Sequence, residues 1–137
     1  MEVIGALFDP GDGRGDWLDQ AGFTLQASAE LLVAGLSEEA ITSAFLAMVY
    51  AARAALEGAE AELPGWEEVV ERFQRDALPA LALSRENQRA LPMVADLYRS
   101  IGGGKIDADP VTAAACLEDA RSFVAEVEAA IARGGQA

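Results

Sequence analysis

The sequence contains no histidine, the side chain that most often acts as a general base near neutral pH. Its absence also removes the usual Glu-x-x-His ligands of a di-metal site in a helical bundle. No serine or cysteine stands in a pattern that pairs it with an activating base, and general acid-base work by an acidic residue has no location in the sequence. We therefore predict no metal site and no cofactor, and we assign no catalytic residue.

Cysteine and long apolar runs are scarce as well. Cys116 is the single cysteine, so no intrachain disulfide can form, and we predict that it is a small core residue. No stretch approaches the ~18 consecutive apolar residues of a membrane-spanning helix. The opening residues 1–10, MEVIGALFDP, lack the basic region of a secretory signal. These features predict a cytoplasmic protein without a membrane partner.

Positive charge is the third deficit. The chain has 10 Lys and Arg against 23 Asp and Glu, a net charge of -13, which should repel nucleic acid and acidic membranes. Residues 72–105 depart from this balance and are locally +3, because they hold the basic residues Arg72, Arg75, Arg85, Arg89, Arg99 and Lys105 but few acidic ones. Either this part forms a cleft for an anion, or its arginines pair with acidic neighbours on helix surfaces.

Strand-like alternation is missing too, and glycine and proline divide the chain into strongly helical stretches. We therefore predict an all-α fold. The first helix should run from about Asp16 to Ala34 and stop at Gly35. Its apolar face is predicted to consist of Trp17, Ala21, Leu25, Ser28 and Leu32, widened by Phe23, Leu31 and Val33.

The second predicted helix is apolar on most of its sides, which is unusual for a surface helix. Ser37 should cap it, with Glu38 and Glu39 in its first turn, and Gly58 should close it. Its main stripe is Ile41, Phe45, Met48, Ala52 and Leu56, and Leu46, Val49 and Tyr50 extend the apolar surface around the helix. Such a helix should be central in the bundle, and its surplus apolar surface suits a second copy of the chain.

Three further helices are predicted. WEEVVERF, residues 66–73, should form a short helix with Trp66, Val69, Val70 and Phe73 inward, limited by Pro79. A long helix should run from Ser84 to Ile101, where Pro92 either kinks it or marks its start. The last helix should begin at Asp109-Pro110 and end at Gly134, with a seam of Leu117, Ala120, Val124, Val127 and Ile131. Between these two helices, GGGKI is predicted to be a connector and not a phosphate-binding loop.

Two segments resemble a known family. Residues 25–57, LQASAELLVAGLSEEAITSAFLAMVYAARAALE, resemble the first two helices of the HEPN family, in its uncharacterised prokaryotic branch. Residues 115–131, ACLEDARSFVAEVEAAI, resemble its closing helix. The matching positions in the first segment include Ala29, Leu32, Gly35, Leu36, Ala40, Ile41, Ala47, Met48, Tyr50, Ala51, Ala52, Arg53, Ala54 and Leu56. The resemblance covers about residues 16–133.

The resemblance implies an up-and-down helical bundle that dimerises through its first long helices. Many members are metal-independent ribonucleases, often toxins paired with a nucleotidyltransferase antitoxin, and their activity rests on an Arg-x4-6-His motif. Arg99 matches that arginine, but Gly104, Lys105 and Ile106 occupy the histidine positions. Ser43 replaces an arginine that is common in the family, and Phe45-Leu46 replaces its Tyr-Tyr pair. The ribonuclease motif is therefore incomplete in this chain.

Together these features predict an N-terminal arm, residues 1–15, followed by a four- to five-helix HEPN-like domain, residues 16–134. Our first hypothesis is a catalytically silent homodimer with its interface at Leu46 and Tyr50. It would bind a partner, such as a nucleotidyltransferase-type protein, or a small anion, through Arg53, Arg99, Lys105 and Tyr50. An alternative is a ribonuclease or nucleotide-handling toxin with a non-standard site at Arg99, Lys105 and Tyr50. A third is an antitoxin-like domain whose acidic surface covers a basic partner.

Overall fold

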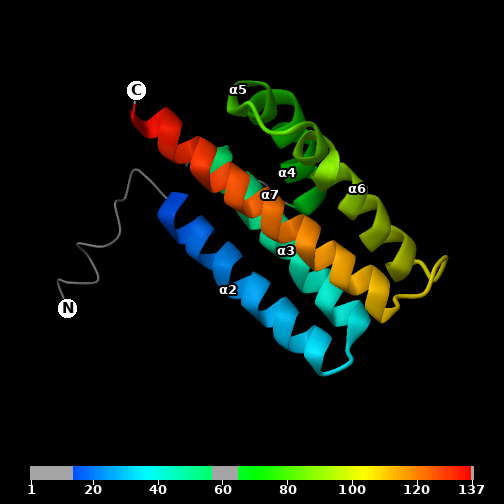
Figure 1. Ribbon diagram of the computed structural model, residues 1–137. Coiled ribbons are helices and arrows are strands. Elements are labelled where there is room, and N and C mark those ends of the chain that lie inside the picture. The colour runs from blue at the N-terminus through cyan, green and yellow to red at the C-terminus, as the bar shows by residue number, and fades with distance from the viewer. Residues whose placement is uncertain (1–13, 57–64, 137) are drawn as a thin grey trace.

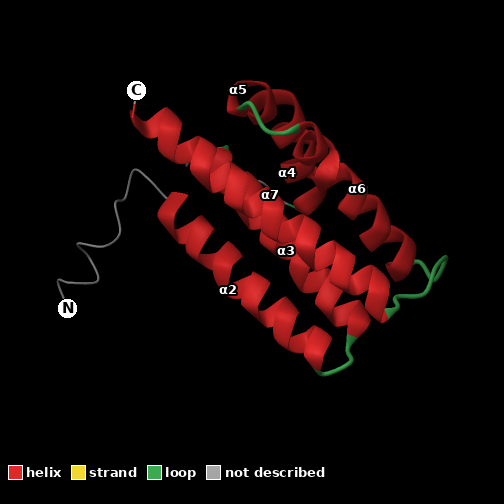
Figure 2. Ribbon diagram, in the orientation of Figure 1, coloured by secondary structure: helices red, strands yellow, loops and turns green. Residues whose placement is uncertain are grey.

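The computed structural model describes residues 14–56 and 65–136, and this part of the chain folds into helices without a β-strand (Figures 1 and 2). Successive long helices run in opposite directions, as in an up-and-down bundle (Figure 1). The helices are α2 (Arg14–Val33), α3 (Ser37–Ala55), α4 (Trp66–Arg72), the π-helical turn η2 (Phe73–Ala77), α5 (Leu78–Leu81), α6 (Arg85–Gly102) and α7 (Pro110–Gln136). The predicted all-α bundle is confirmed.

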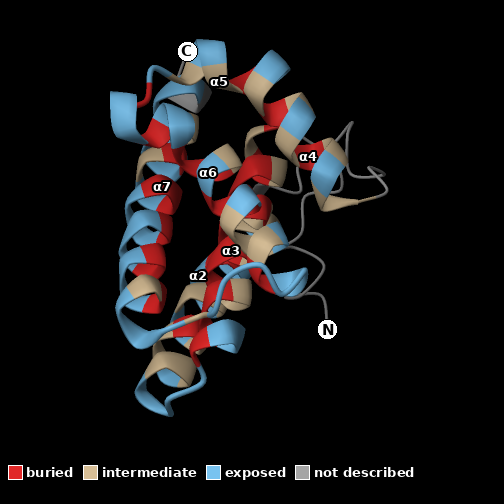
Figure 3. Cartoon of the chain, turned by 90° about the vertical axis from the view of Figure 1, so that its right-hand side faces the viewer, coloured by how far each residue is buried: buried red, intermediate tan, exposed pale blue. Residues whose placement is uncertain are grey.

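Helix α3 lies at the centre of the bundle and packs against α2, α4, α6 and α7. Phe45 and Met48 are fully buried, as are most of its alanines, which allow neighbouring helices to approach closely. Buried residues gather on the inward faces of α3, α6 and α7 (Figure 3). The predicted central position is therefore confirmed. The cap differs from the prediction: Leu36 is the N-cap residue, and Ser37 is already helical and buried.

Helix α2 turns the predicted stripe inward, and Leu31 packs against the core beside it as expected, but Phe23 and Val33 do not widen that face. Ala21 and Ser28 are fully buried, and the Ser28 hydroxyl donates to the carbonyl oxygen of Ala40 at 2.7 Å, which ties α2 to α3. Phe23 and Val33 were placed wrongly, because they are 67% and 89% exposed. Phe23 is two residues from Ala21, a rotation of about 200° around an α-helix, so it lies on the opposite face.

The ends of α2 also differ slightly from the prediction. The helix begins at Arg14 rather than Asp16, so most of the predicted N-terminal arm lies outside the described residues. Gly35 ends it as predicted, with a φ of +83° that suits glycine. The amides of Gly35 and Leu36 donate to the carbonyls of Leu32 and Leu31 at 3.0 and 2.9 Å, which closes the helix end.

The segment after Gly65 is helical for longer than WEEVVERF. Val69 and Phe73 are buried as predicted, and Trp66 and Val70 are half-buried. The chain then continues through η2 into α5, because Pro79 falls in the first turn of α5, where a missing amide hydrogen breaks no helical bond. Ala82, at φ +57°, marks the end of this segment.

Helices α6 and α7 form the other side of the bundle. The sequence left open whether Pro92 kinks α6 or begins it. Pro92 lies inside α6, so the helix does not begin there. Asp109 caps α7 as predicted, since its carboxylate accepts from the Thr112 amide at 2.8 Å, and this bond lowers the pKa of Asp109. The predicted stop at Gly134 is wrong, because α7 continues to Gln136. A glycine within a helix costs only about 1 kcal/mol and does not by itself end one.

The α7 seam packs inward as expected, with Leu117, Ala120, Val124 and Val127 buried. Cys116 is buried beside this seam, as predicted for a core residue, and burial raises the pKa of its thiol to about 11. Among residues 14–56 and 65–136, no helix combines the length and the apolar character that a membrane span needs. The predicted closure of the second helix at Gly58 lies outside the described residues.

Candidate functional site

Two of the four predicted ligand-binding residues meet on one side of α3, beside Trp17 of α2. The ring of Tyr50 stacks on that of Trp17, with centroids 5.8 Å apart. The Arg53 guanidinium lies over the same indole ring, 5.0 Å from its centroid. Tyr50 and Arg53 are thus adjacent, as their spacing on one helix predicts.

Arg99 lies against a different aromatic ring. Its guanidinium is 4.9 Å from the Trp66 ring and donates to the Asp96 carboxylate at 2.9 Å. Trp66 in turn meets Phe45 and Tyr98 edge to face, with ring centroids 5.1 and 5.7 Å away. A cavity of about 210 Å³ adjoins Arg99, and its lining includes Glu38, Ile41, Thr42 and Tyr98. Both contacts of Arg99 hold it in place on the protein itself.

Lys105, the fourth predicted residue, is exposed in the connection between α6 and α7. The four predicted residues therefore do not form one site. Tyr50 and Arg53 lie beside Trp17, Arg99 lies on Trp66, and Lys105 lies in the connection between α6 and α7. Leu46, which was predicted at a dimer interface, is half-buried and lies outside the buried core. It belongs to a half-buried strip that we name the outer stripe of α3, namely Thr42, Ser43, Leu46, Tyr50 and Arg53.

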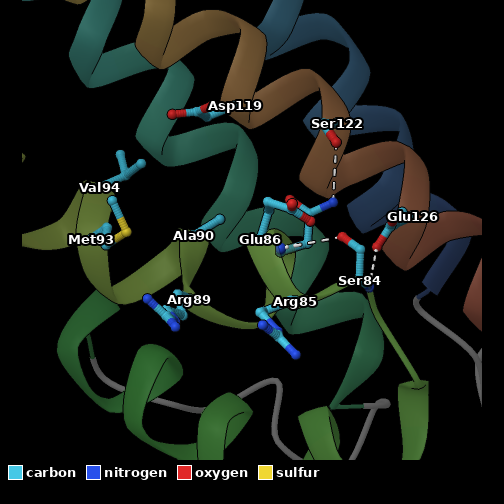
Figure 4. Close-up of a pocket in the computed structure, with 11 residues that line it drawn as sticks. Ser84, Arg85, Glu86, Arg89, Ala90, Met93, Val94, Asp119, Ser122 and Glu126 are labelled. Carbon is cyan, nitrogen blue, oxygen red and sulfur yellow. Dashed lines mark hydrogen bonds between the residues drawn. The ribbon is translucent and has the colours of Figure 1, made fainter.

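The structure also contains a hollow that the sequence did not reveal. It has a volume of about 670 Å³ and lies between the first half of α6 and α7 (Figure 4). We name it the α6–α7 groove. Residues from α6 and its cap form one wall, and Asp119, Ser122 and Glu126 of α7 face them. Its α6 side consists of Ser84, Arg85, Glu86, Asn87, Arg89, Ala90, Met93 and Val94.

Hydrogen bonds between the start of α6 and α7 fix the end of this groove. The Ser84 amide donates to the Glu126 carboxylate at 2.9 Å, and this bond lowers the pKa of Glu126. The buried Asn87 side chain donates to the Ser122 hydroxyl at 3.0 Å, and the backbone amide of Asn87 donates to the Ser84 hydroxyl. The start of α6 is thus capped by the protein, and α6 and α7 cannot separate there without losing these bonds.

Arg85 and Arg89 give the groove a positively charged side. They lie four residues apart in α6, both are exposed, and neither takes part in a hydrogen bond, ion pair or ring contact among the described residues. In the sequence, only the local charge of +3 over residues 72–105 pointed to these two arginines. Glu86 stands three residues before Arg89, so only the structure could show that the two do not pair.

No three His, Cys, Asp or Glu side chains come together as metal ligands anywhere in the described ranges 14–56 and 65–136. The two acidic side chains that α7 contributes to the groove lie apart, since Glu126 accepts the Ser84 amide and Asp119 lies about two helical turns away along α7. The arrangement offers charge and shape for binding.

The sequence matches no protein-family model, and no curated protein matches it. Its fold is similar to that in the crystal structure of TT1696 from Thermus thermophilus, with a TM-score of 0.70 and 19% sequence identity. The match covers 86% of this chain and 98% of that one, so nearly the whole of TT1696 has the same arrangement of helices. At this identity the likeness concerns the fold alone.

Proposed function

We propose that the chain is a catalytically silent, HEPN-like helical bundle that acts as a dimeric binding module. The observation that carries this proposal is the state of Arg99, which matches the family's catalytic arginine. Its guanidinium is engaged by the Trp66 ring and by Asp96, and the sequence has no histidine to work with it. An arginine held in this way supports the aromatic cluster of α3, α4 and α6 rather than a reaction.

Metal-independent cleavage of RNA requires a group that accepts the proton of the ribose 2'-hydroxyl near neutral pH. The family places histidine there, and this chain has Gly104, Lys105 and Ile106 at those positions. Glycine and isoleucine carry no ionisable group, and lysine is ordinarily protonated at neutral pH. The proposal therefore requires that the protein binds its partner and does not cleave RNA.

The outer stripe of α3 supports dimerisation. Leu46 is an aliphatic side chain that α3 leaves partly exposed, and Tyr50 continues the stripe one turn later. An isologous contact between two such stripes would bury both copies of Leu46. The resemblance further implies a nucleotidyltransferase-type partner in a toxin-antitoxin pair, which we retain as part of the proposal.

The first prediction concerns the dimer. Purified protein is expected to sediment as a homodimer at micromolar concentrations, and Leu46→Glu is expected to sediment as a monomer with an unchanged helical circular dichroism spectrum. The reason is that a carboxylate in place of Leu46 must lose its hydration when two outer stripes meet, and the aliphatic contact between the two copies is lost. Phe23→Glu is the matched control, because Phe23 is 67% exposed on the outer face of α2 and should leave the dimer intact.

A monomeric wild-type protein would contradict the proposed dimer. If Phe23→Glu dissociates the dimer and Leu46→Glu does not, the interface lies instead at the surface between α2 and α7 around Phe23.

The second prediction concerns activity. The purified protein is expected to cleave single-stranded RNA no faster than background, and Arg99→Ala should show the same rate, because no near-neutral base stands at the family's site. Gel or fluorescence assays after repeated purification measure both rates. Cleavage that survives repurification and disappears in Arg99→Ala would refute the silent role and favour the enzyme hypothesis.

A further inference from the structure

Arg85 and Arg89 differ from the other arginines whose side chains the structure describes. Arg53, Arg72, Arg75, Arg99, Arg121 and Arg133 each contact a carboxylate, a carbonyl or an aromatic ring. Arg85 and Arg89 have no such partner in the described part of the chain, although the sequence has 23 acidic residues to offer. Two cations one turn apart on a helix repel each other, so the pair weakens α6 in the free protein.

The same strip of α6 carries an exposed apolar side chain. Met93 follows Arg89 by one more turn and is 62% exposed, while Ala90 and Val94 beside it are buried in the floor of the groove. From Arg85 to Met93 the strip extends over about 12 Å, which is two turns of helix. Methionine is flexible and polarizable, and it adapts well to the side chains of a binding partner.

The α7 side of the groove limits what this strip can bind. Asp119 and Glu126 face α6 across the groove, and the exposed Glu86 follows Arg85 on α6 itself. All three carboxylates repel an anion that fills the whole width of the groove. A polyanion such as RNA would meet these carboxylates and a protein of net charge -13. A suitable ligand therefore carries its negative charge on one side only, toward Arg85 and Arg89.

The groove is also too open for a small molecule. Arg85, Glu86, Arg89, Met93, Asp119 and Ser122 are all exposed, whereas small-molecule sites usually enclose most of the ligand surface. A protein segment laid along the groove needs no such enclosure, since its remaining surface faces solvent or its own domain. An amphipathic helix satisfies both the charge pattern and the shape, because carboxylates four residues apart match two arginines four residues apart.

We propose that the α6–α7 groove docks an acidic amphipathic helix of a partner protein. Two carboxylates of that helix, one turn apart, pair with Arg85 and Arg89, and an apolar side chain one turn further covers Met93. This proposal deepens the proposed binding role and rests on it, but the groove does not include the outer stripe of α3. Docking therefore does not depend on the dimer interface.

A synthetic helical peptide tests the proposal. It carries Glu-x3-Glu-x3-Leu in an alanine and glutamine background with a fluorescent label, and companion peptides replace both glutamates with glutamine or with lysine. We expect saturable binding of the glutamate peptide by fluorescence anisotropy, weaker binding of the glutamine peptide and none of the lysine peptide. The double variant Arg85→Glu with Arg89→Glu should weaken binding by about tenfold or more, because two attractive charge pairs become repulsive.

The matched control is the double variant Arg75→Glu with Arg121→Glu, which makes the same change in net charge at arginines outside the groove. It should bind the glutamate peptide as the wild type does, and Met93→Glu should bind it less tightly than the wild type. Equal binding of the glutamate and lysine peptides, no binding, or equal losses in the two double variants would overturn the proposal. So would binding of single-stranded RNA that is lost in Arg85→Glu with Arg89→Glu.

The monomeric Leu46→Glu variant separates this proposal from the proposed function. We expect it to bind the glutamate peptide with unchanged affinity. If Leu46→Glu abolishes dimerisation while no form of the protein binds the peptide, the dimeric module stands and the groove is not its docking site. If the peptide binds and the wild type is monomeric, the groove proposal stands and the dimer falls.

Discussion

Replacing Met48 with aspartate is expected to prevent folding. Met48 is fully buried in the middle of α3, the helix that contacts α2, α4, α6 and α7. A carboxylate there would have no ion-pair partner, and an uncompensated buried charge destabilises a protein by about 3 to 5 kcal/mol. The lost packing of the methionine adds about 2 to 5 kcal/mol. The sum approaches the whole stability of a typical domain, about 5 to 15 kcal/mol.

Leu46→Asp is the matched control, because it places the same side chain in the same helix on the half-buried outer stripe. Far-ultraviolet circular dichroism should show a loss of helix for Met48→Asp and a full helical signal for Leu46→Asp. Sedimentation reports the oligomeric state of each. A Met48→Asp protein that is fully helical and cooperative in urea would mean that the core tolerates a charge at this position.

Phe45→Ala is expected to lower the free energy of unfolding by about 3 to 5 kcal/mol, the usual cost of removing a buried phenylalanine side chain. Phe45 is fully buried and stacks on Tyr98 with a centroid distance of 4.9 Å, in addition to its edge contact with Trp66. The substitution therefore leaves a cavity and removes two aromatic pairs. Urea denaturation followed by circular dichroism measures the loss.

Phe73→Ala provides the control for this change. Phe73 is equally buried and meets Phe123 with ring centroids 5.5 Å apart, whereas the rings that contact Trp66 are Phe45 and Tyr98. Both variants should lose similar stability, but only Phe45→Ala should shift the fluorescence of Trp66, measured with Trp17→Phe in the background. An unchanged Trp66 spectrum in Phe45→Ala would show that the ring cluster does not depend on Phe45.

Local sequence predicted the helices and several of their ends well. Gly35 and Asp109 act through their own backbone conformation or through bonds to residues three positions away, so their effects can be recognised without knowing the fold. The apolar stripes of α3 and α7 were predictable for a similar reason, because a period of 3.6 residues is a property of each helix alone.

Errors occurred where a residue's position depended on which helix covered it. Phe23 was expected to widen the apolar face of the first helix, but it is 67% exposed on α2. Gly134 was expected to end the last helix, but α7 continues to Gln136, because a single glycine within a helix costs only about 1 kcal/mol. For Pro92 the sequence left a kink and a helix start open, and the structure places it inside α6.

The sequence by itself determined the helical class, the central helix, the acidic surface and the missing histidine, because composition and short-range spacing carry all four. Only the tertiary structure decided which arginines are engaged. Arg53 and Arg99 acquired aromatic partners from other helices. The start of α6 was fixed against α7, and Arg85 and Arg89 have no partner among residues 14–56 and 65–136. Contacts of this kind join residues far apart in the chain, and their geometry follows from how the helices pack against one another.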